Sequence, residues 1–205
     1  MLTIHHLIVG RSVFTVWLLE ELGIEYQLEP YHRLATRRAP PELREVHPLG
    51  KSPVIVDEGR TIAESGAIAT YLLEKYDPDH ELSPPPSDRD RWVQFIQWLH
   101  YPEGSAFGPL SLVLLSASSP EPMPQLVQDF ATAEVKLHLD YIESALKERD
   151  YILGNEFSAA DIGLGYIVAL ADRLQLIEGR ETISAYLQRL QQRPAFQRAH
   201  ERSGG

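Results

Sequence analysis

The stretch His47–Tyr76, HPLGKSPVIVDEGRTIAESGAIATYLLEKY, decides the fold of this chain. It begins with a loop that ends at a Ser52-Pro53 step. Its composition then predicts two short strands joined by an Asp-Glu-Gly turn, at residues 54–56 and 60–63. Glu64 and Ser65 follow at the start of a predicted helix that runs to Tyr76. This order predicts a small polar cradle built from backbone groups and side chains.

The residues before this stretch predict a βαβ unit. Residues 2–9 are apolar and β-branched, which predicts a buried strand, and residues 26–31 predict a second strand. Residues 12–22 between them predict a helix that Gly23 ends. A short crossover of this kind makes the two strands parallel. A short helix or irregular turn is expected over 39–46. Together with the two later strands and their helix, these elements predict a small α/β domain.

The chain after Tyr76 is predicted to be a linker followed by helices. Residues 77–88, DPDHELSPPPSD, contain four prolines, which lack an N–H donor and restrict the preceding residue. Helices are then predicted at 90–115 (interrupted near Pro102 and Gly104), 126–146, 159–174, 182–192 and from Pro194 onward. Ser158 and Asp161 have the spacing of a capping box for the third of these. The predicted domains are therefore 1–78 and 88–205, with a proline-rich linker at 79–87.

Composition limits the classes of function. Lys and Arg total 19 against 29 Asp and Glu, a net charge of −10 that disfavours nucleic acid and anionic membranes as partners. No cysteine is present, which excludes disulfides, thiolate metal sites and a cysteine nucleophile. We find no apolar run of membrane-spanning length, no signal-peptide pattern and no metal-ligand spacing. A cytoplasmic protein without a metal is expected.

The Ser52-Pro53 step has two interpretations. It is either an ordinary trans bond before a strand, or a cis bond, a form found in only about 5–6% of X–Pro bonds in folded proteins. A cis bond at this place, between a βαβ half and a ββα half, would turn the backbone N–H and C=O of Ser52 outward. The chain could then bind an extended peptide in the manner of a β-strand.

Two further motifs have both a structural and a functional interpretation. Glu64-Ser65 either belongs to a helix cap, through Thr61 and Glu64 or through Ser65, or holds the ammonium and carboxylate of an amino acid. Gly10-Arg11-Ser12 is either a simple helix start capped by Ser12, or an anion site made from a helix N-terminus, a hydroxyl and a guanidinium. The residues by themselves leave both pairs of alternatives open.

Four segments together resemble the cytosolic glutathione transferases over nearly the whole chain. They are SVFTVWLLEELGIEY, HPLGKSPVIVDEG, TIAESGAIATYLLEKY and GNEFSAADI. The resemblance implies a thioredoxin-like α/β N-terminal domain and an all-helical C-terminal domain, usually in a homodimer, that join the thiol of glutathione to electrophiles. The segments WLHYPEGSAFGPL and PPELREVHPLGKSPV resemble the bacterial branch, within it the cyanobacterial chi class.

The resemblance also implies roles for individual residues in binding glutathione. Pro53 would be cis, the main chain of Ser52 would pair with the cysteinyl part, Glu64 and Ser65 would hold the γ-glutamyl end, and Lys51 would meet the glycine carboxylate. One departure concerns the activator of the thiol. Bacterial relatives often carry a serine where this chain has Gly10, so the catalytic candidates that remain are Arg11 and Ser12.

Three functions compete at this point. The first is a conjugating transferase with glutathione as co-substrate and no other cofactor, acting on isothiocyanates or aryl halides. The second is a non-catalytic glutathione-binding regulatory or interaction protein of the same fold. The third, a glutathione-dependent reductase, normally needs a protein thiol, and the absence of cysteine argues against it.

The second substrate and the partner subunit complete the expectations. From their positions, Phe14, Tyr101 and Phe107 are predicted to line an apolar pocket for the electrophile between the domains. A homodimer is expected to cover apolar surface along the helices predicted at 159–174 and 182–192. Glu103 or a neighbouring acid would reach the partner's glutathione.

Overall fold

The computed structural model describes residues 1–204, which form two compact units. The first unit contains Met1–Ser83 together with the residues from Gln191 onward, and the second contains Pro84–Leu190. Within the described residues no helix is both long enough and apolar enough to cross a membrane. The fold class is the one expected, an α/β N-terminal part and a helical C-terminal part.

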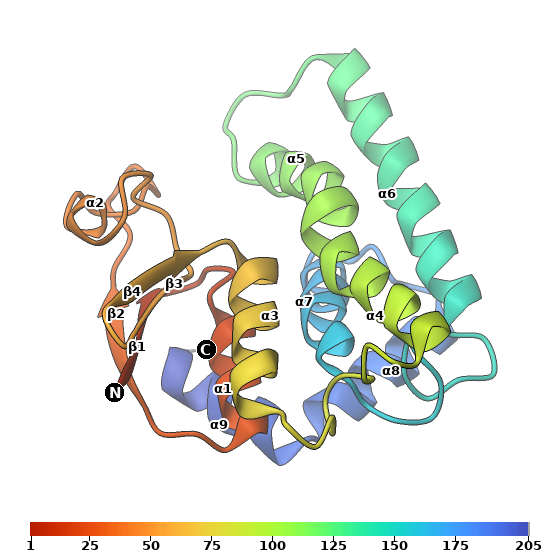
Figure 1. Ribbon diagram of the computed structural model, residues 1–205. Helices are drawn as coiled ribbons and strands as arrows, with labels where there is room; N and C mark the ends of the chain where they lie inside the picture. The colour runs from red at the N-terminus through yellow and green to blue at the C-terminus, as the bar shows by residue number, and fades with distance from the viewer. Residues whose placement is uncertain (205) are drawn as a thin grey trace. The chain divides into compact units, whose positions relative to one another are not determined.

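The first unit is built on a four-stranded sheet (Figure 1). Its strands are β1 (Leu2–Leu7), β2 (Tyr26–Tyr31), β3 (Val54–Asp57) and β4 (Arg60–Ala63), in the spatial order β2-β1-β3-β4. β1 and β2 are parallel, as the predicted crossover requires, whereas β3 runs antiparallel to both β1 and β4. In the two central strands, Ile4 of β1 and Val54 and Ile55 of β3 are fully buried.

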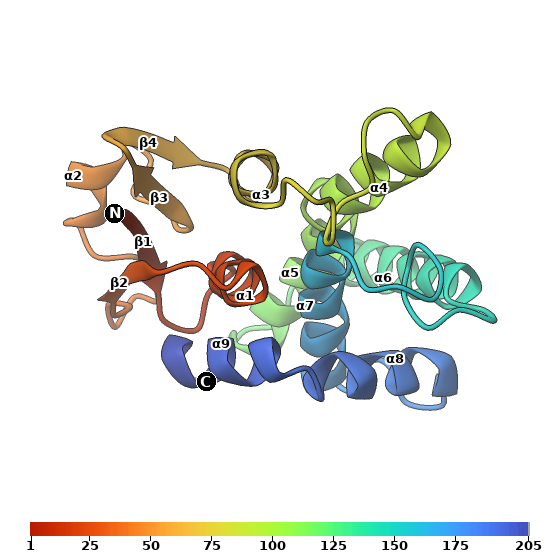
Figure 2. The ribbon, with the colours of Figure 1, turned by 60° about the horizontal axis from the view of Figure 1, so that its bottom comes forward.

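Two helices of the first unit lie on the same face of this sheet. They are α1 (Val13–Leu22) and α3 (Ser65–Tyr76), whereas the single-turn helix α2 (Leu43–Val46) lies on the opposite side (Figure 2). Gly23 ends α1 in the left-handed conformation at φ 64°, which glycine adopts without steric cost. The strands and helices predicted for residues 1–76 are thus confirmed to within two residues, and the short helix falls within 39–46.

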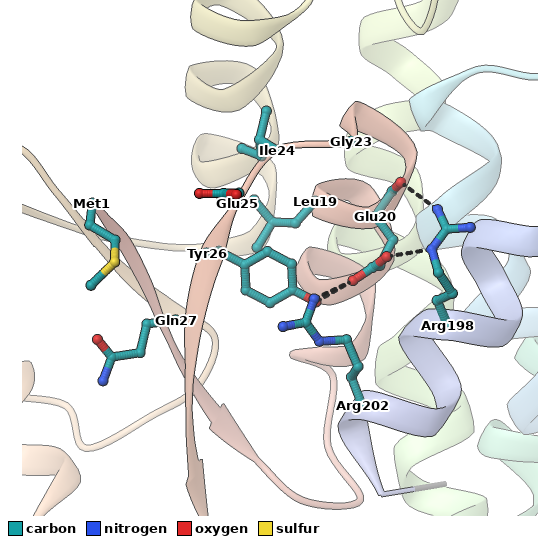
Figure 3. A pocket seen from close by; sticks show the side chains of 10 residues that line it. All are labelled: Met1, Leu19, Glu20, Gly23, Ile24, Glu25, Tyr26, Gln27, Arg198 and Arg202. Carbon is teal, nitrogen blue, oxygen red and sulfur yellow. Dashed lines mark hydrogen bonds and ion pairs between the residues drawn. The ribbon is translucent and has the colours of Figure 1, made fainter.

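The last helix, α9 (Pro194–Ser203), packs against α1 and belongs to the first unit. Arg198 and Arg202 both contact the carboxylate of Glu20, at 2.7 and 2.8 Å, and Arg202 also lies 4.2 Å from the ring centre of Tyr26 (Figure 3). Periodicity predicts a helix here, but its partners lie more than 170 residues earlier in the chain. For this reason the sequence predicts that the helix belongs to the helical domain. In the structure its contacts assign it to the first unit, which contains the sheet.

The second unit consists of helices. They are α4 (Arg89–Tyr101), the π-helical turn η1 (Pro102–Ala106), α5 (Phe107–Ala117), α6 (Gln125–Ala145), α7 (Ala159–Arg173) and α8 (Glu181–Gln191). The interruption predicted near Pro102 and Gly104 is this π-helical turn. α7 provides much of the core, with ten buried residues between Ala159 and Ala171.

Asp161 organises the start of α7. The capping box with Ser158 is present, which confirms the prediction, and Asp161 is fully buried. Its carboxylate also accepts hydrogen bonds from the Ile152 N–H at 2.8 Å and the Tyr186 hydroxyl at 2.9 Å. Burial raises the pKa of this carboxyl, and the four hydrogen bonds counteract that effect. The cap is therefore also the contact that joins α7 to α8.

Candidate functional site

Three loops of the first unit meet at one edge of the sheet. Val54 at the start of β3 pairs with His5 near the end of β1 and with Ala63 at the end of β4. Because β3 is antiparallel to both neighbours, the residues that follow β1, precede β3 and follow β4 all emerge at this edge. These residues are the segments 8–12, 51–53 and 64–65, which contain every glutathione-binding and catalytic residue predicted from the sequence.

The middle loop contains the Ser52–Pro53 peptide bond, which is cis, as the resemblance implied. The Ser52 hydroxyl donates to the carbonyl of His5 at 2.7 Å and accepts from the N–H of Leu7 at 3.1 Å. The side chain therefore fastens the loop to the end of β1. This arrangement agrees with the expectation that a ligand would use the main chain of Ser52 instead of its hydroxyl. Lys51 beside it is exposed.

Glu64 occupies the N-cap position of α3 in a conformation that is rare for a side-chain-bearing residue. Its backbone lies at φ 70° and ψ 119°, and it makes no side-chain capping bond. Thr61 is paired with Val56 inside β4, and Ser65 is the first helical residue. Both capping interpretations of the Glu64-Ser65 motif are therefore wrong. Backbone strain of this kind is concentrated at functional sites, and the Glu64 side chain is exposed.

The loop after β1 is held in a tight conformation. Val9 has a φ of 55°, and its carbonyl accepts from the Arg33 guanidinium at 3.0 and 3.3 Å. A Cβ atom at position 10 would lie 2.6 Å from the carbonyl oxygen of Leu7, which is closer than such atoms approach in proteins. A residue with a side chain at position 10 would therefore force the backbone of this loop to shift, and glycine avoids the clash.

Ser12 lies inside the domain. It is fully buried, and its hydroxyl contacts Nδ1 of His6 at 2.8 Å and the N–H of Leu7 at 3.2 Å. Although it precedes α1, it makes no side-chain capping bond, so the simple capping interpretation is wrong. The catalytic role of Ser12 stays a prediction, and its hydroxyl is committed to these internal contacts. Arg11, one residue earlier, is half-buried within the loop.

The electrostatic character of this edge suits an anionic ligand with one ammonium group. α1 and α3 both begin here, and the N-terminus of a helix carries a partial positive charge and N–H groups for an anion. Arg11 and Lys51 add two cationic side chains in the adjoining loops, while Glu64 supplies one exposed carboxylate. A peptide with two carboxylates and one α-ammonium would find a counterpart for each charge.

The residues predicted for the second substrate are divided between the two units. Phe14 is buried in α1 of the first unit, whereas Tyr101 and Phe107 lie at the end of α4 and the start of α5 in the second. The Tyr101 hydroxyl lies 2.7 Å from Nδ1 of His138, and burial raises its pKa. Glu103 is half-buried in η1. Their roles stay predictions.

Two residues at this edge were missed by the sequence analysis. His6 is buried beneath the first loop, and Arg33 holds the carbonyl of Val9. A buried histidine within an apolar strand was a usable signal, but its partners lie elsewhere in the chain. Within residues 1–204 no group of three or more His, Cys, Asp or Glu residues could hold a metal ion.

These features define a thioredoxin-like α/β domain followed by a helical domain. Residues 5–74 match the family model for the N-terminal domain of glutathione S-transferase, and residues 117–198 match the model for its C-terminal domain. The chain belongs to the glutathione S-transferase family. Its relatives are named glutathione S-transferases, which identifies it as a glutathione transferase.

Individual relatives cover nearly the full length. Glutathione S-transferase 3 of Schizosaccharomyces pombe is 34% identical over 98% of this chain and 88% of its own length. Glutathione S-transferase 1 of Saccharomyces cerevisiae is 33% identical over 83% of this chain and 81% of its own. The crystal structure of a glutathione S-transferase from Actinobacillus pleuropneumoniae is 32% identical and superposes with a TM-score of 0.89, covering 100% of this chain and 94% of that one.

Proposed function

We propose that the protein joins the thiolate of glutathione to small electrophiles such as isothiocyanates or aryl halides. The observation that carries this proposal is the position of Glu64. Its strained backbone lies at the N-terminus of α3, one residue after Ala63. Ala63 pairs with Val54, which directly follows the cis Pro53. The carboxylate and the cis-proline loop are thereby adjacent on one sheet edge.

Each part of glutathione has a proposed partner at this edge. The Ser52 main chain pairs with the cysteinyl residue, because a strand end with a cis proline presents backbone groups to an extended peptide. Glu64 holds the γ-glutamyl ammonium, and the N-terminus of α3 with the Ser65 hydroxyl holds the adjacent carboxylate. Lys51 is exposed beside Ser52 and meets the glycine carboxylate.

Activation of the thiol is proposed to rest on positive charge. A free thiol has a pKa of about 8.5, so a mostly ionised thiol at pH 7 requires a decrease of about two units, or roughly 2.7 kcal/mol. Arg11 and the N-terminus of α1 favour the thiolate over the thiol. Ser12 is the second candidate, and because its hydroxyl is buried it acts through the structure of the loop.

We also propose that the protein is a homodimer. Of the six large apolar residues that are exposed in the second unit, Val93 and Leu115 lie on α4 and α5. The other four lie along α6, where Leu126, Phe130, Leu137 and Tyr141 are 81, 55, 59 and 41% exposed. Their spacing of four, seven and four residues places them in one stripe. The helices that the sequence analysis had chosen, now α7 and α8, direct their large apolar residues into the core instead. A second copy of the chain would cover this stripe. In the same proposed dimer, Glu103 would contact the glutathione that is bound to the partner subunit.

Location and class follow from the same resemblance. We place the protein in the cytoplasm and in the bacterial branch of the family, in the chi class. The proposal for the class rests on the segments 40–54 and 98–110 alone. Of the relatives named above, two are fungal and one is bacterial.

Calorimetry and a turnover assay test the function together. We expect glutathione to bind with a dissociation constant in the micromolar to millimolar range, and a chromogenic aryl halide or an isothiocyanate to be consumed with glutathione. No heat with millimolar glutathione would remove the basis of the proposal. Binding without turnover of either electrophile would favour the non-catalytic glutathione-binding protein.

A further inference from the structure

A buried histidine links the end of the chain to the first loop of the site. Nε2 of His6 lies 3.0 Å from the carbonyl oxygen of Ser203, and Nδ1 lies 2.8 Å from the hydroxyl of Ser12. The three residues are 1, 3 and 0% exposed, so water does not compete for these contacts. Ser203 is the last residue of α9, and Ser12 immediately precedes α1.

The chemistry of these contacts fixes the direction of each hydrogen bond. Burial lowers the pKa of His6, and the bond to Ser203 counteracts this only in part, so the imidazole is neutral at pH 7. A carbonyl oxygen can only accept a hydrogen bond, hence Nε2–H donates to the Ser203 carbonyl. Nδ1 therefore accepts a hydrogen bond from the Ser12 hydroxyl. The Ser12 oxygen is then available to accept from the N–H of Leu7 at 3.2 Å.

The same N–H group carries the network to the second loop. Leu7 donates to the hydroxyl of Ser52 at 3.1 Å as well as to that of Ser12. Ser52 in turn donates to the carbonyl of His5 at 2.7 Å. One continuous set of hydrogen bonds therefore runs from Ser203 through His6 to both loops that flank the proposed thiol position, and it is one residue from Arg11 and from Pro53.

The far end of this network is firmly anchored. Arg193, which precedes α9, forms two bonds with the Glu21 carboxylate at 2.7 and 2.8 Å, and Arg202 contacts Glu20 near the other end of the helix. Between them, Phe196 packs edge-on against Trp17 with ring centres 5.0 Å apart. The Ser203 carbonyl is thus held in place relative to α1 and can fix the orientation of the imidazole ring.

We infer that His6 is a positioning residue for the glutathione site, through which the C-terminal helix holds Ser12 and Ser52 in register. This inference rests on the proposed function, since it concerns the geometry that glutathione meets. Loss of the imidazole contacts would leave Ser12 and the loop 8–12 able to shift, and small displacements of a site are costly to its chemistry. His6 touches neither ligand nor sulfur and acts only through these serines.

Three substitutions of His6 test the inference in the full-length protein. His6→Phe keeps the ring shape and removes both contacts. His6→Asn places an amide where Nδ1 stands and preserves the contact with Ser12, whereas His6→Gln reaches the Nε2 position and preserves only the contact with Ser203. Tyr71→Phe is the matched control, because it removes hydrogen bonds of the same unit that lie outside the network, to Asp57 at 2.9 Å and from Lys75 at 3.4 Å.

The readouts are the dissociation constant of glutathione and the pKa of its bound thiol, followed by ultraviolet absorbance of the thiolate. We expect His6→Phe to weaken binding by about tenfold and to raise the thiol pKa. His6→Gln and His6→Asn should each raise this pKa as well, because each breaks one of the two links between Ser203 and Ser12, whereas Tyr71→Phe should leave it near the wild-type value. If His6→Phe does not fold, the comparison of His6→Gln and His6→Asn with Tyr71→Phe decides the question.

The possible failures are distinct. If the wild-type protein does not bind glutathione, the proposed function fails and the positioning role fails with it. If the wild-type protein binds and ionises glutathione but the His6 variants match it, only the positioning role is overturned. Equal changes in a His6 variant and in Tyr71→Phe would likewise overturn it, because they would reflect general destabilisation.

Discussion

Val54 and Ala63 face each other across the antiparallel strands β3 and β4, and this pair brings the two halves of the proposed glutathione site together. Pro53 precedes one member of the pair and Glu64 follows the other. Neighbouring strands lie about 4.8 Å apart, so the cis peptide bond and the strained N-cap of α3 are held side by side by backbone hydrogen bonds. The position of the site therefore depends on the register of the β3–β4 hairpin.

Removal of the Glu64 carboxylate should weaken glutathione binding. We expect Glu64→Ala to raise the dissociation constant about 10- to 100-fold, since a hydrogen bond to a charged group contributes about 1.5–3 kcal/mol. Titration calorimetry measures the effect. Glu74→Ala removes an exposed carboxylate from the same helix and serves as the control. Equal affinities of the two variants would show that the Glu64 carboxylate does not bind glutathione.

The charge of Arg11 should matter more to the thiol than the hydroxyl of Ser12. We expect Arg11→Ala to raise the pKa of bound glutathione by about one unit, because a fixed positive charge favours the thiolate. Arg11→Lys, which keeps the charge, should retain most of the effect. Ultraviolet titration of the thiolate compares these variants with Ser12→Ala. A larger shift in Ser12→Ala than in Arg11→Ala would contradict the arginine role.

Asp161→Ala should destabilise the protein without altering its affinity for glutathione. Four donors, including the Ile152 N–H and the Tyr186 hydroxyl, would lose a fully buried acceptor. The expected loss is about 2–4 kcal/mol in the free energy of unfolding. Denaturant titration measures it, and Asp172→Ala, an exposed position near the end of the same helix, is the control. A loss no larger than that of the control would show that the cap contributes little.

Acid should weaken the attachment of α9. Burial alone would raise the pKa of Glu20, but the hydrogen bonds from the Tyr26 hydroxyl and two arginines outweigh it, so the pKa lies below its ordinary value of 4.5. A lowered folded-state pKa gives stability that is present above pH 4.5 and is lost as the pH falls through the folded value. Glu20→Gln should therefore lower the free energy of unfolding by about 1–3 kcal/mol at pH 7. Acidification should then lower this free energy less in the variant than in the wild-type protein.

Denaturant titrations between pH 7 and pH 3 follow this effect. Glu25→Gln, which removes an exposed carboxylate next to the cluster, should keep the wild-type profile. If the Glu20→Gln and wild-type curves run parallel over this range, the ion pairs do not stabilise the folded state.

An acidic residue in the α6 stripe should prevent dimer formation. Leu137 is 59% exposed at the centre of the stripe, and a charge there would be costly to bury without a partner. Light scattering should give twice the 23.2 kDa chain mass for the wild-type protein and the single mass for Leu137→Asp. Leu34→Asp, at an exposed leucine of the first unit, should remain dimeric. A wild-type particle of 23 kDa at micromolar concentration would contradict the homodimer.

The sequence by itself determined the elements and the family. Alternating and helical periodicities depend on residues close together in the chain, so β2, β4 and α3 were predicted with their observed bounds. The spacing of Ser158 and Asp161 sufficed for the capping box because a helix start is a local structure. The segments around Ser52-Pro53 and Glu64-Ser65 identified the family, since the ligand contacts of such a fold are grouped in short motifs.

Only the tertiary structure decided which groups are available at the site. Ser12 is two residues from Gly10 in the chain, yet its hydroxyl points into the domain because it donates a hydrogen bond to His6 on the adjacent strand. The last helix belongs to the first unit because Glu20 and Glu21 bind its arginines across more than 170 residues. Such contacts depend on the packing of distant segments, for which periodicity and local spacing carry no information.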